Sequence, residues 1–226
     1  MTFYAGALMN HFPGHKYLDA LRFFEFSPKS PRPRGATLTR VRHALPEGTR
    51  IALRAPRAAL VTDQGPLRTS ESQAAELAWT LDAAERLAVR LLVLTTPPTL
   101  MPSPRSRELL RRFAEQLPRV SGRHYVWMPQ GAWELEEADE IASELGLVCG
   151  FDPIQQERPS GKVVFARLAA IGAQTGFSDA TLMEVLARIA TQPYSEAYVS
   201  IDSMRSLQQA VRLQQQAGYN DGDSGP

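Results

Sequence analysis

The chain has little of several features that would mark a specialised class of protein. It holds one cysteine, Cys149, so no disulfide can form within the chain and no cysteine-based metal knuckle can be assembled. No apolar run approaches the roughly 18 residues of a membrane span. The amino-terminal segment MTFYAGALMNHFPGH also lacks the basic start and apolar stretch of a secretion signal. We therefore expect a cytoplasmic protein without a membrane partner, in which Cys149 is a small core residue.

Net charge is also nearly absent. Lysine and arginine total 25 against 24 acids, which leaves a net charge of +1. Such a balance excludes a global field that would steer the protein onto nucleic acid or anionic lipid, so any such partner needs a local basic patch. The hydrophobic content of 43% over 226 residues is enough for a sizeable core and excludes disorder of most of the chain.

The common motifs of cofactor, metal and nucleophile sites are missing. No GxGxxG or GxxxxGK[ST] phosphate loop, GxSxG elbow, HExxH or HxH occurs. The four histidines are dispersed, and Pro13 and Gly14 interrupt the spacing between the first two, so these cannot share a regular helical face. The histidines are His11, His15, His43 and His124. We expect neither a metal site nor a bound cofactor.

Short apolar runs do alternate with longer segments of helical period, and this pattern is typical of βαβ units. The expected strands are Thr2–Ala7, Phe23–Ser27, Arg50–Ala55, Arg90–Thr95, Tyr125–Gln130, Leu147–Asp152, Val163–Leu168 and Glu196–Asp202. The expected helices are KYLDALRF, ATLTRVRHAL, SQAAELAWTLDAAERLAV, PRSRELLRRFAEQL, LEEADEIASEL, DATLMEVLARIA and MRSLQQAVRLQQQ. Ser103, Ser178 and Ser203 are placed to cap three of these helices.

Eight buried parallel strands with outer helices predict a closed α/β barrel of the TIM type. Because such barrels usually take roughly 250 residues, 226 residues predict a shortened version. The segment Pro153–Lys162 is the shortened crossover, with no room for a helix of normal length. A doubly wound open sheet is the alternative architecture. We expect a single barrel domain over residues 1–218 and a disordered polar tail over 219–226.

Function in such a barrel gathers at the carboxyl-terminal ends of the strands. The polar residues found there are Glu25, Ser27, Arg54, Thr95, Thr96, Gln130, Asp152, Arg167 and Asp202. Charges in strands as apolar as FFEFS and VVFARL are costly unless they are paired or face a wet pocket. In one interpretation the acids and arginines pair across the mouth and hold it in register. In the other, the arginines bind an anionic ligand while an acid orients it or moves a proton.

Two charge runs offer other surfaces. Residues 29–57 hold eight bases opposed only by Glu47, and the proline-stiffened loop SPKSPRPRG should rise beside the predicted mouth. Residues 134–157 hold eight acids and no base, which predicts a solvated helix face. Trp127 and Trp133 lie on and after the fifth strand, where an aromatic ring packs in a core or stacks on a ligand.

Several strand-end segments match a known family. FFEFS stands where that family has V-E-I-N, RIALRAP where it has F-A-V-K-A-P, and LLVLTTPPTL where it has L-F-Q-L-P-P-S-F. GAWELEE corresponds to H-P-S-W followed by acids, CGFDP to the family's strand-six aspartate, and VVFARL to Y-V-R-L-H-G. From about Phe3 to Gln214 the chain therefore resembles the YecE-like family, domain of unknown function 72, as a divergent member.

This resemblance implies a shortened barrel whose pocket positions are Glu25, Arg54, Trp133, Asp152 and Arg167. The family is similar in fold to xylose-isomerase-like barrels and to endonuclease four, which implies a nucleic-acid role as one alternative. Here, however, the family's G-T-S-G-W is GALMNHF, its E-F-R-H is VWMPQ, and its strand-eight asparagines give way to SID. The side chains that metal-dependent nuclease chemistry would need are missing.

We therefore expect the barrel mouth to bind a phosphate- or carboxylate-bearing ligand. Arg54, Arg167, Trp133 and Asp202 would contact this ligand, and Glu25 and Asp152 would be the orienting or acid/base groups. One alternative is a non-catalytic barrel that serves as a scaffold and binds a protein partner; the other is a nucleic-acid-binding protein. The residues leave open whether the protein is an enzyme.

Overall fold

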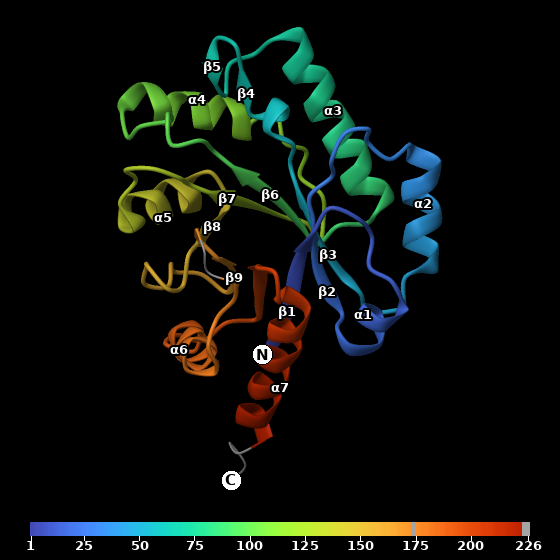
Figure 1. Cartoon of the computed structure of the whole chain (residues 1–226). Helices are drawn as coiled ribbons and strands as arrows, with labels where there is room; N and C mark the ends of the chain where they lie inside the picture. Colours follow the sequence, from blue (N-terminus) through green and yellow to red (C-terminus); the bar gives the residue numbers. More distant parts are fainter. Residues whose placement is uncertain (173–174, 223–226) are drawn as a thin grey trace.

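A computed structural model describes residues 1–172 and 175–222, with side chains as far as Gly218. In this part of the chain, eight parallel strands close into a barrel in the order β1-β10-β9-β8-β7-β6-β3-β2 (Figure 1). The barrel strands are β1 (Thr2–Met9), β2 (Phe23–Phe26), β3 (Arg50–Arg54), β6 (Leu91–Thr95), β7 (His124–Met128), β8 (Val148–Phe151), β9 (Val163–Ala169) and β10 (Glu196–Asp202). The prediction of a closed barrel is confirmed, and the open sheet is excluded.

The helices lie in the crossovers where the sequence predicted them. They are α1 (His15–Ala20), α2 (Gly35–Ala44), α3 (Glu71–Arg86), α4 (Pro104–Ala114), α5 (Leu135–Glu144), α6 (Asp179–Ile189) and α7 (Ser206–Gly222). Between β8 and β9 every residue is described, and the chain forms turns there in place of a helix, as predicted. This short crossover is one reason why 226 residues suffice for the barrel.

Two features differ from the expected elements. A short helix η1 (Arg57–Ala59) and a small hairpin of β4 (Val61–Thr62) and β5 (Gly65–Pro66) occupy the loop after β3. The last helix, α7, runs to Gly222 and so covers the first four residues of the expected tail. The rest of that tail, residues 223–226, lies outside the described residues.

Serine side chains fix the starts of several helices. The hydroxyl of Ser103 accepts a hydrogen bond from the Ser106 amide at 3.1 Å, with Pro104 at the first helical position of α4. Ser178 caps α6 through the Thr181 amide at 3.1 Å. The expected cap by Ser203 is wrong, because its hydroxyl accepts from the Arg205 amide at 3.2 Å, in the turn ahead of the first residue of α7, Ser206. The caps of Ser103 and Ser178 set where these two crossovers turn back toward the barrel.

Side chains fill the barrel interior in layers. The middle of the barrel is apolar and contains Phe23, Ala52, Leu91, Val93, Val126, Met128, Phe165 and Tyr198. Because side chains alternate across a strand, the residues two positions further along β2, β3 and β9 also point inward, and these are Glu25, Arg54 and Arg167. The apolar middle therefore separates the carboxyl-terminal mouth from the amino-terminal end of the barrel.

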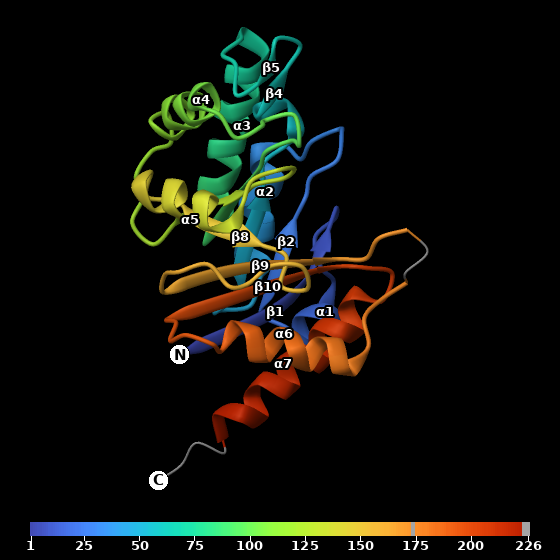
Figure 2. The ribbon, with the colours of Figure 1, turned by 90° about the vertical axis from the view of Figure 1, so that its left-hand side faces the viewer.

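A larger core lies between the barrel and its helices. Helix α7 packs on β1 and β10, and α6 lies beside α7 on the same side of the barrel (Figure 2). Cys149 belongs to this outer core, as expected. In the described residues, no helix combines the length and the hydropathy needed to cross a lipid bilayer.

Candidate functional site

An ion pair between Glu25 on β2 and Arg167 on β9 occupies the interior just below the carboxyl-terminal mouth. The Glu25 side chain is 0% exposed and that of Arg167 is 6% exposed. Arg167 Nε donates to Glu25 Oε2 at 3.2 Å, and Arg167 Nη2 donates to Oε1 in the second arm of a bidentate pair. In this geometry the planar guanidinium faces the planar carboxylate, which makes the ion pair strong and fixes the orientation of both side chains. The pair joins strands that are not neighbours in the barrel.

Two hydroxyls complete this cluster. Ser200 on β10 donates to Glu25 Oε2 at 2.5 Å, and Arg167 Nη1 donates to Thr95 Oγ1 on β6 at 3.2 Å. Ser200 is the register partner of Arg167, so adjacent strands bring both groups to Glu25. The four side chains thus form one hydrogen-bonded network from four strands. We call Glu25, Thr95, Arg167 and Ser200 the mouth network.

Arg54 on β3 points inward above this network but does not pair with it. The half-buried Arg54 guanidinium makes no hydrogen bond or ion pair with any residue that the structure describes. Burial, followed by the nearby charge of Arg167, lowers the pKa of Arg54, while Glu25 and Asp202 oppose this shift. A cavity of about 110 Å³ adjoins Arg54, and its wall includes Arg57, Thr95 and Gln130. An unpaired cation therefore faces a small polar hollow.

The two aspartates expected at the site lie on its rim. Asp202 is exposed at the end of β10 and is close enough to influence Arg54 electrostatically. Asp152 follows β8 and is half-buried, and its Oδ1 accepts from the Ile154 amide at 2.9 Å within its own loop. Burial raises the pKa of Asp152, partly offset by hydrogen bonds from its own loop and by the charge of Arg188. The structure places no hydrogen bond between Asp152 and the mouth network.

Trp133 lies outside the mouth cavity. Its ring is 6% exposed and packs edge-to-face on Trp127, with ring centroids 5.3 Å apart. Trp133 Nε1 donates to the Leu100 carbonyl at 2.6 Å, so its polar atom is already satisfied. Both tryptophans thus pack in the core between the barrel and its helices. Core packing, and not stacking on a ligand, is the use of these aromatic rings.

The charged runs found in the sequence divide among several surfaces. Arg32, in the loop after β2, pairs with Glu76 of α3 and stacks over Trp79 at 4.8 Å from the ring centroid. On the acidic helix α5, Glu137 pairs with Arg107 at 2.5 Å, and Asp139 accepts from the Ser160 amide at 2.7 Å. These contacts tie crossovers to one another. In the described part of the chain, no group of three or more His, Cys, Asp and Glu side chains could hold a metal ion.

Several solved structures have the same architecture as this chain. A DUF72 family protein from Thermotoga maritima MSB8 aligns over 98% of this chain and 100% of its own, with a TM-score of 0.71 at 15% identity. A DUF72 family protein from Enterococcus faecalis V583 aligns over 96% of this chain and 98% of its own, with a TM-score of 0.68 at 10% identity. The chain has the fold of DUF72 family proteins. The resemblance drawn from its strand-end motifs is confirmed at the level of the fold.

The DUF72 fold is shared by barrels with other names. Endonuclease IV from Thermus thermophilus aligns over 97% of this chain and 100% of its own, with a TM-score of 0.59 at 16% identity. No family model matches the sequence, and no curated protein matches it. At such low identity the likeness shows the fold alone, and any chemistry has to be argued from the side chains.

Within this DUF72-like barrel the residues named from sequence fall into three groups. Glu25 and Arg167 belong to the mouth network, Arg54 and Asp202 lie beside it, and Asp152 and Trp133 make contacts elsewhere. Sequence reasoning overlooked Ser200 as a site residue. The missing signal is the alternation of β10, because Ser200 lies two residues before Asp202 and so faces the same side.

Proposed function

We propose that the carboxyl-terminal mouth of the barrel binds a small ligand with a phosphate or carboxylate group, and that Arg54 is its main contact. The observation that carries this proposal is the half-buried Arg54 guanidinium, which lacks a hydrogen-bonded partner among the described residues and adjoins the 110 Å³ cavity. Arginine stays charged and presents five donors in a fixed fork, which suits planar or tetrahedral anions. An anion there would compensate a cation that burial penalises.

The size and lining of the cavity favour an anionic group over a large metabolite. Its volume of about 110 Å³ is a few times the roughly 30 Å³ that a water molecule occupies in the liquid. Arg57 supplies a second cation in the wall, and Gln130 and Thr95 supply neutral polar groups. The anionic group of the ligand would enter the cavity while the rest of the ligand stays over the exposed rim.

In this proposal the mouth network positions the cavity wall. Arg167 is fully engaged by Glu25 and Thr95, so it acts as a positioning residue, and its charge adds to the positive potential at Arg54. Thr95 belongs to both the network and the cavity, which couples the two. Glu25 orients Arg167. Asp152, whose pKa burial raises, is the half-buried rim acid that we assign to proton transfer.

A thermal-shift screen of phosphate- and carboxylate-bearing metabolites tests the proposal. A ligand that binds the folded state raises the apparent melting temperature, and Arg54→Met should abolish that rise. Arg105→Met is the matched control, since Arg105 is an exposed arginine on α4 that does not line the cavity. An equal rise for wild type and Arg54→Met would refute the mouth as the site.

Nucleic acid is the second candidate partner, and the likeness of the fold to an endonuclease supports it. Arg54 and Arg57 at the mouth would then contact phosphates of a backbone. Phosphate-dominated binding weakens steeply as salt rises, so titrations of duplex and single-stranded DNA at several salt concentrations decide the matter. Binding that is undetectable at low salt would exclude this candidate.

A further inference from the structure

The amino-terminal end of the barrel, opposite the mouth, carries a larger and more basic cavity. Its volume is about 400 Å³, and it lies against the starts of β3, β6 and β7 and the ends of α2 and α3. The wall holds four arginines, Arg42, Arg50, Arg90 and Arg123, and one acid, Glu85. These arginines come from three parts of the sequence, one that holds Arg42 and Arg50 and two others that hold Arg90 and Arg123. The fold therefore concentrates positive charge at one place in a chain that is nearly neutral overall.

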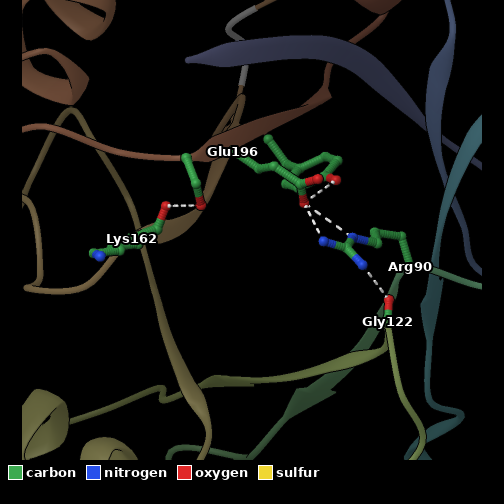
Figure 3. Close-up of polar contacts among 6 residues, drawn as sticks. Arg90, Gly122, Lys162 and Glu196 are labelled. Atoms are coloured by element: carbon green, nitrogen blue, oxygen red, sulfur yellow. Dashed lines mark hydrogen bonds and ion pairs between the residues drawn. The ribbon is translucent and has the colours of Figure 1, made fainter.

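Arg90 is the arginine of this wall that is held in place. It reaches across the barrel from the start of β6 to Glu196 of β10, where Nε donates to Oε2 at 2.9 Å and Nη2 forms an ion pair with the same oxygen at 2.8 Å (Figure 3). Nη1 of Arg90 donates to the Gly122 carbonyl at 2.5 Å, and Tyr198 Oη donates to Glu196 at 2.8 Å. Glu196 thus neutralises Arg90 from behind the cavity. This network gives the cavity a fixed floor.

Two other arginines of the wall lack such partners. The Nε atoms of Arg50 and Arg123 are buried and have no hydrogen-bond partner among the described residues. Arg42 makes one long contact, from Nη1 to the Thr49 carbonyl at 3.4 Å, which leaves its other donors available. Buried donors without acceptors cost free energy, and the arginines that carry them line the cavity, where an acceptor with several oxygens would meet their remaining donors.

The charge balance specifies what kind of acceptor would fit. Four arginines stand against Glu85 in the wall and Glu196 behind it, which leaves two positive charges uncompensated. The positive charge also acts on His124 at the start of β7. Burial and then the charge of Arg90 lower the pKa of its imidazole, while Glu196 opposes this shift. A dianion matches both the charge excess and the number of free donors. Phosphate groups are the common biological dianions of this size.

We propose that this cavity is a second ligand site, which binds a small phosphate-bearing molecule through Arg50 and Arg123 with Arg42 at its edge. The site is separate from the mouth, since the apolar layer of Phe23, Phe165 and their neighbours fills the barrel between them. Arg90 and Glu196 position the floor and do not compete for the ligand. The volume of about 400 Å³ accommodates more than a bare phosphate, so a phosphate ester is the class of ligand expected.

Calorimetric titration with inorganic phosphate and with pyrophosphate, against a chloride background of matched ionic strength, tests this proposal. Wild type should bind at least one of these probes. Arg123→Gln and Arg50→Gln should each weaken binding about tenfold, which corresponds to about 1.4 kcal/mol. Arg105→Gln should leave it unchanged, because Arg105 is equally charged but lies on an exposed face of α4. Arg54→Gln separates this site from the mouth, since it should remove any binding of the probe at the mouth and keep the component that Arg50→Gln and Arg123→Gln weaken.

Two further measurements guard against a merely structural effect. Arg123 lies in the loop before β7, so Arg123→Gln should keep the melting temperature of the ligand-free protein. Arg50→Lys keeps the charge and should recover part of the binding that Arg50→Gln loses. The proposal is overturned if neither probe binds above the chloride background, or if both glutamine variants bind as wild type does. Binding of duplex DNA through these arginines, with no response to either probe, would also overturn it.

Discussion

Glu25 and Arg167 show how strongly a single buried contact can constrain this molecule. Two opposite charges almost without solvent exposure lose most of their hydration, and their mutual attraction only roughly balances that loss. The bidentate geometry and the Ser200 hydroxyl supply the hydrogen bonds that make the arrangement tolerable. The pair is therefore expected to fix the arrangement of the mouth more than to add net stability.

A prediction follows for the removal of one partner. Arg167→Met leaves the Glu25 carboxylate buried without its counter-charge, and we expect the free energy of unfolding to fall by about 3–5 kcal/mol. The double variant Glu25→Leu/Arg167→Met removes both charges and should lie much closer to wild type. Urea unfolding monitored by circular dichroism measures all three proteins. A single variant no less stable than the double variant would contradict this description of the pair.

Cys149 gives a second prediction at the scale of one residue. Burial raises the pKa of its thiol to about 12, with a smaller contribution from the charge of Asp139. Only the thiolate attacks disulfide reagents, so native protein at pH 8 should react at least about a hundredfold more slowly than protein in concentrated urea. The absorbance of a released aromatic thiol follows the reaction. Equal rates in the two conditions would show that Cys149 is accessible in the native fold.

At the scale of elements, the closure of β1 on β2 depends on Gly6. A Cβ atom at this position would lie 2.2 Å from the Phe23 carbonyl oxygen, far inside van der Waals contact. The obstacle is backbone of the neighbouring strand, which cannot move aside as a flexible side chain can. The two strands therefore approach as closely as they do because Gly6 has no side chain.

We therefore expect Gly6→Ala to lower the free energy of unfolding by more than about 2 kcal/mol, in the range of overpacked cores and strained backbone. Gly14→Ala is the matched control, because no atom lies within 4 Å of a Cβ at that position. Chemical denaturation of the two variants and wild type gives the comparison. A Gly6→Ala protein as stable as Gly14→Ala would mean that β1 and β2 lie further apart than described.

The sequence predicts the barrel elements well because of how they are buried. Strands such as β6 and β9 are covered on both faces, so their residues form short and nearly continuous apolar runs. The helices that the structure describes do not contain such runs. The loop after β3 escapes prediction because β4 and β5 hold two residues each, too few for any periodic pattern. Helix α7 passes Gly218 because nothing packs against that position, and a glycine in a helix costs only about 1 kcal/mol.

At the scale of the whole molecule, the barrel has two polar ends separated by an apolar middle. Glu25, Arg54 and Arg167 gather at the carboxyl-terminal mouth, as strand direction alone predicts. Strand direction does not decide which side chains pair, and this is why Asp152 and Trp133 could not be separated from the others by sequence. Their partners, the Ile154 amide and the Leu100 carbonyl, are backbone groups that the sequence pattern does not identify.

The basic run of residues 29–57 shows the same limit. In the sequence these residues form one charged segment, but in the fold their side chains lie at different places. Arg32 packs on Trp79, Arg54 faces the mouth, and Arg50 faces the cavity at the amino-terminal end. Arg50 and Arg54 lie on the same face of β3, four residues apart, so one strand carries an arginine to each end of the barrel.

The central claim is that Arg54 contacts the ligand at the mouth. Nuclear magnetic resonance of protein labelled with nitrogen-15 arginine tests it most directly, with each Nε resonance assigned by substitution. On titration with the ligand found by thermal shift, we expect the Arg54 resonance to move in proportion to occupancy while that of exposed Arg105 stays fixed. Movement confined to Arg50 and Arg123, with Arg54 unchanged, would contradict it.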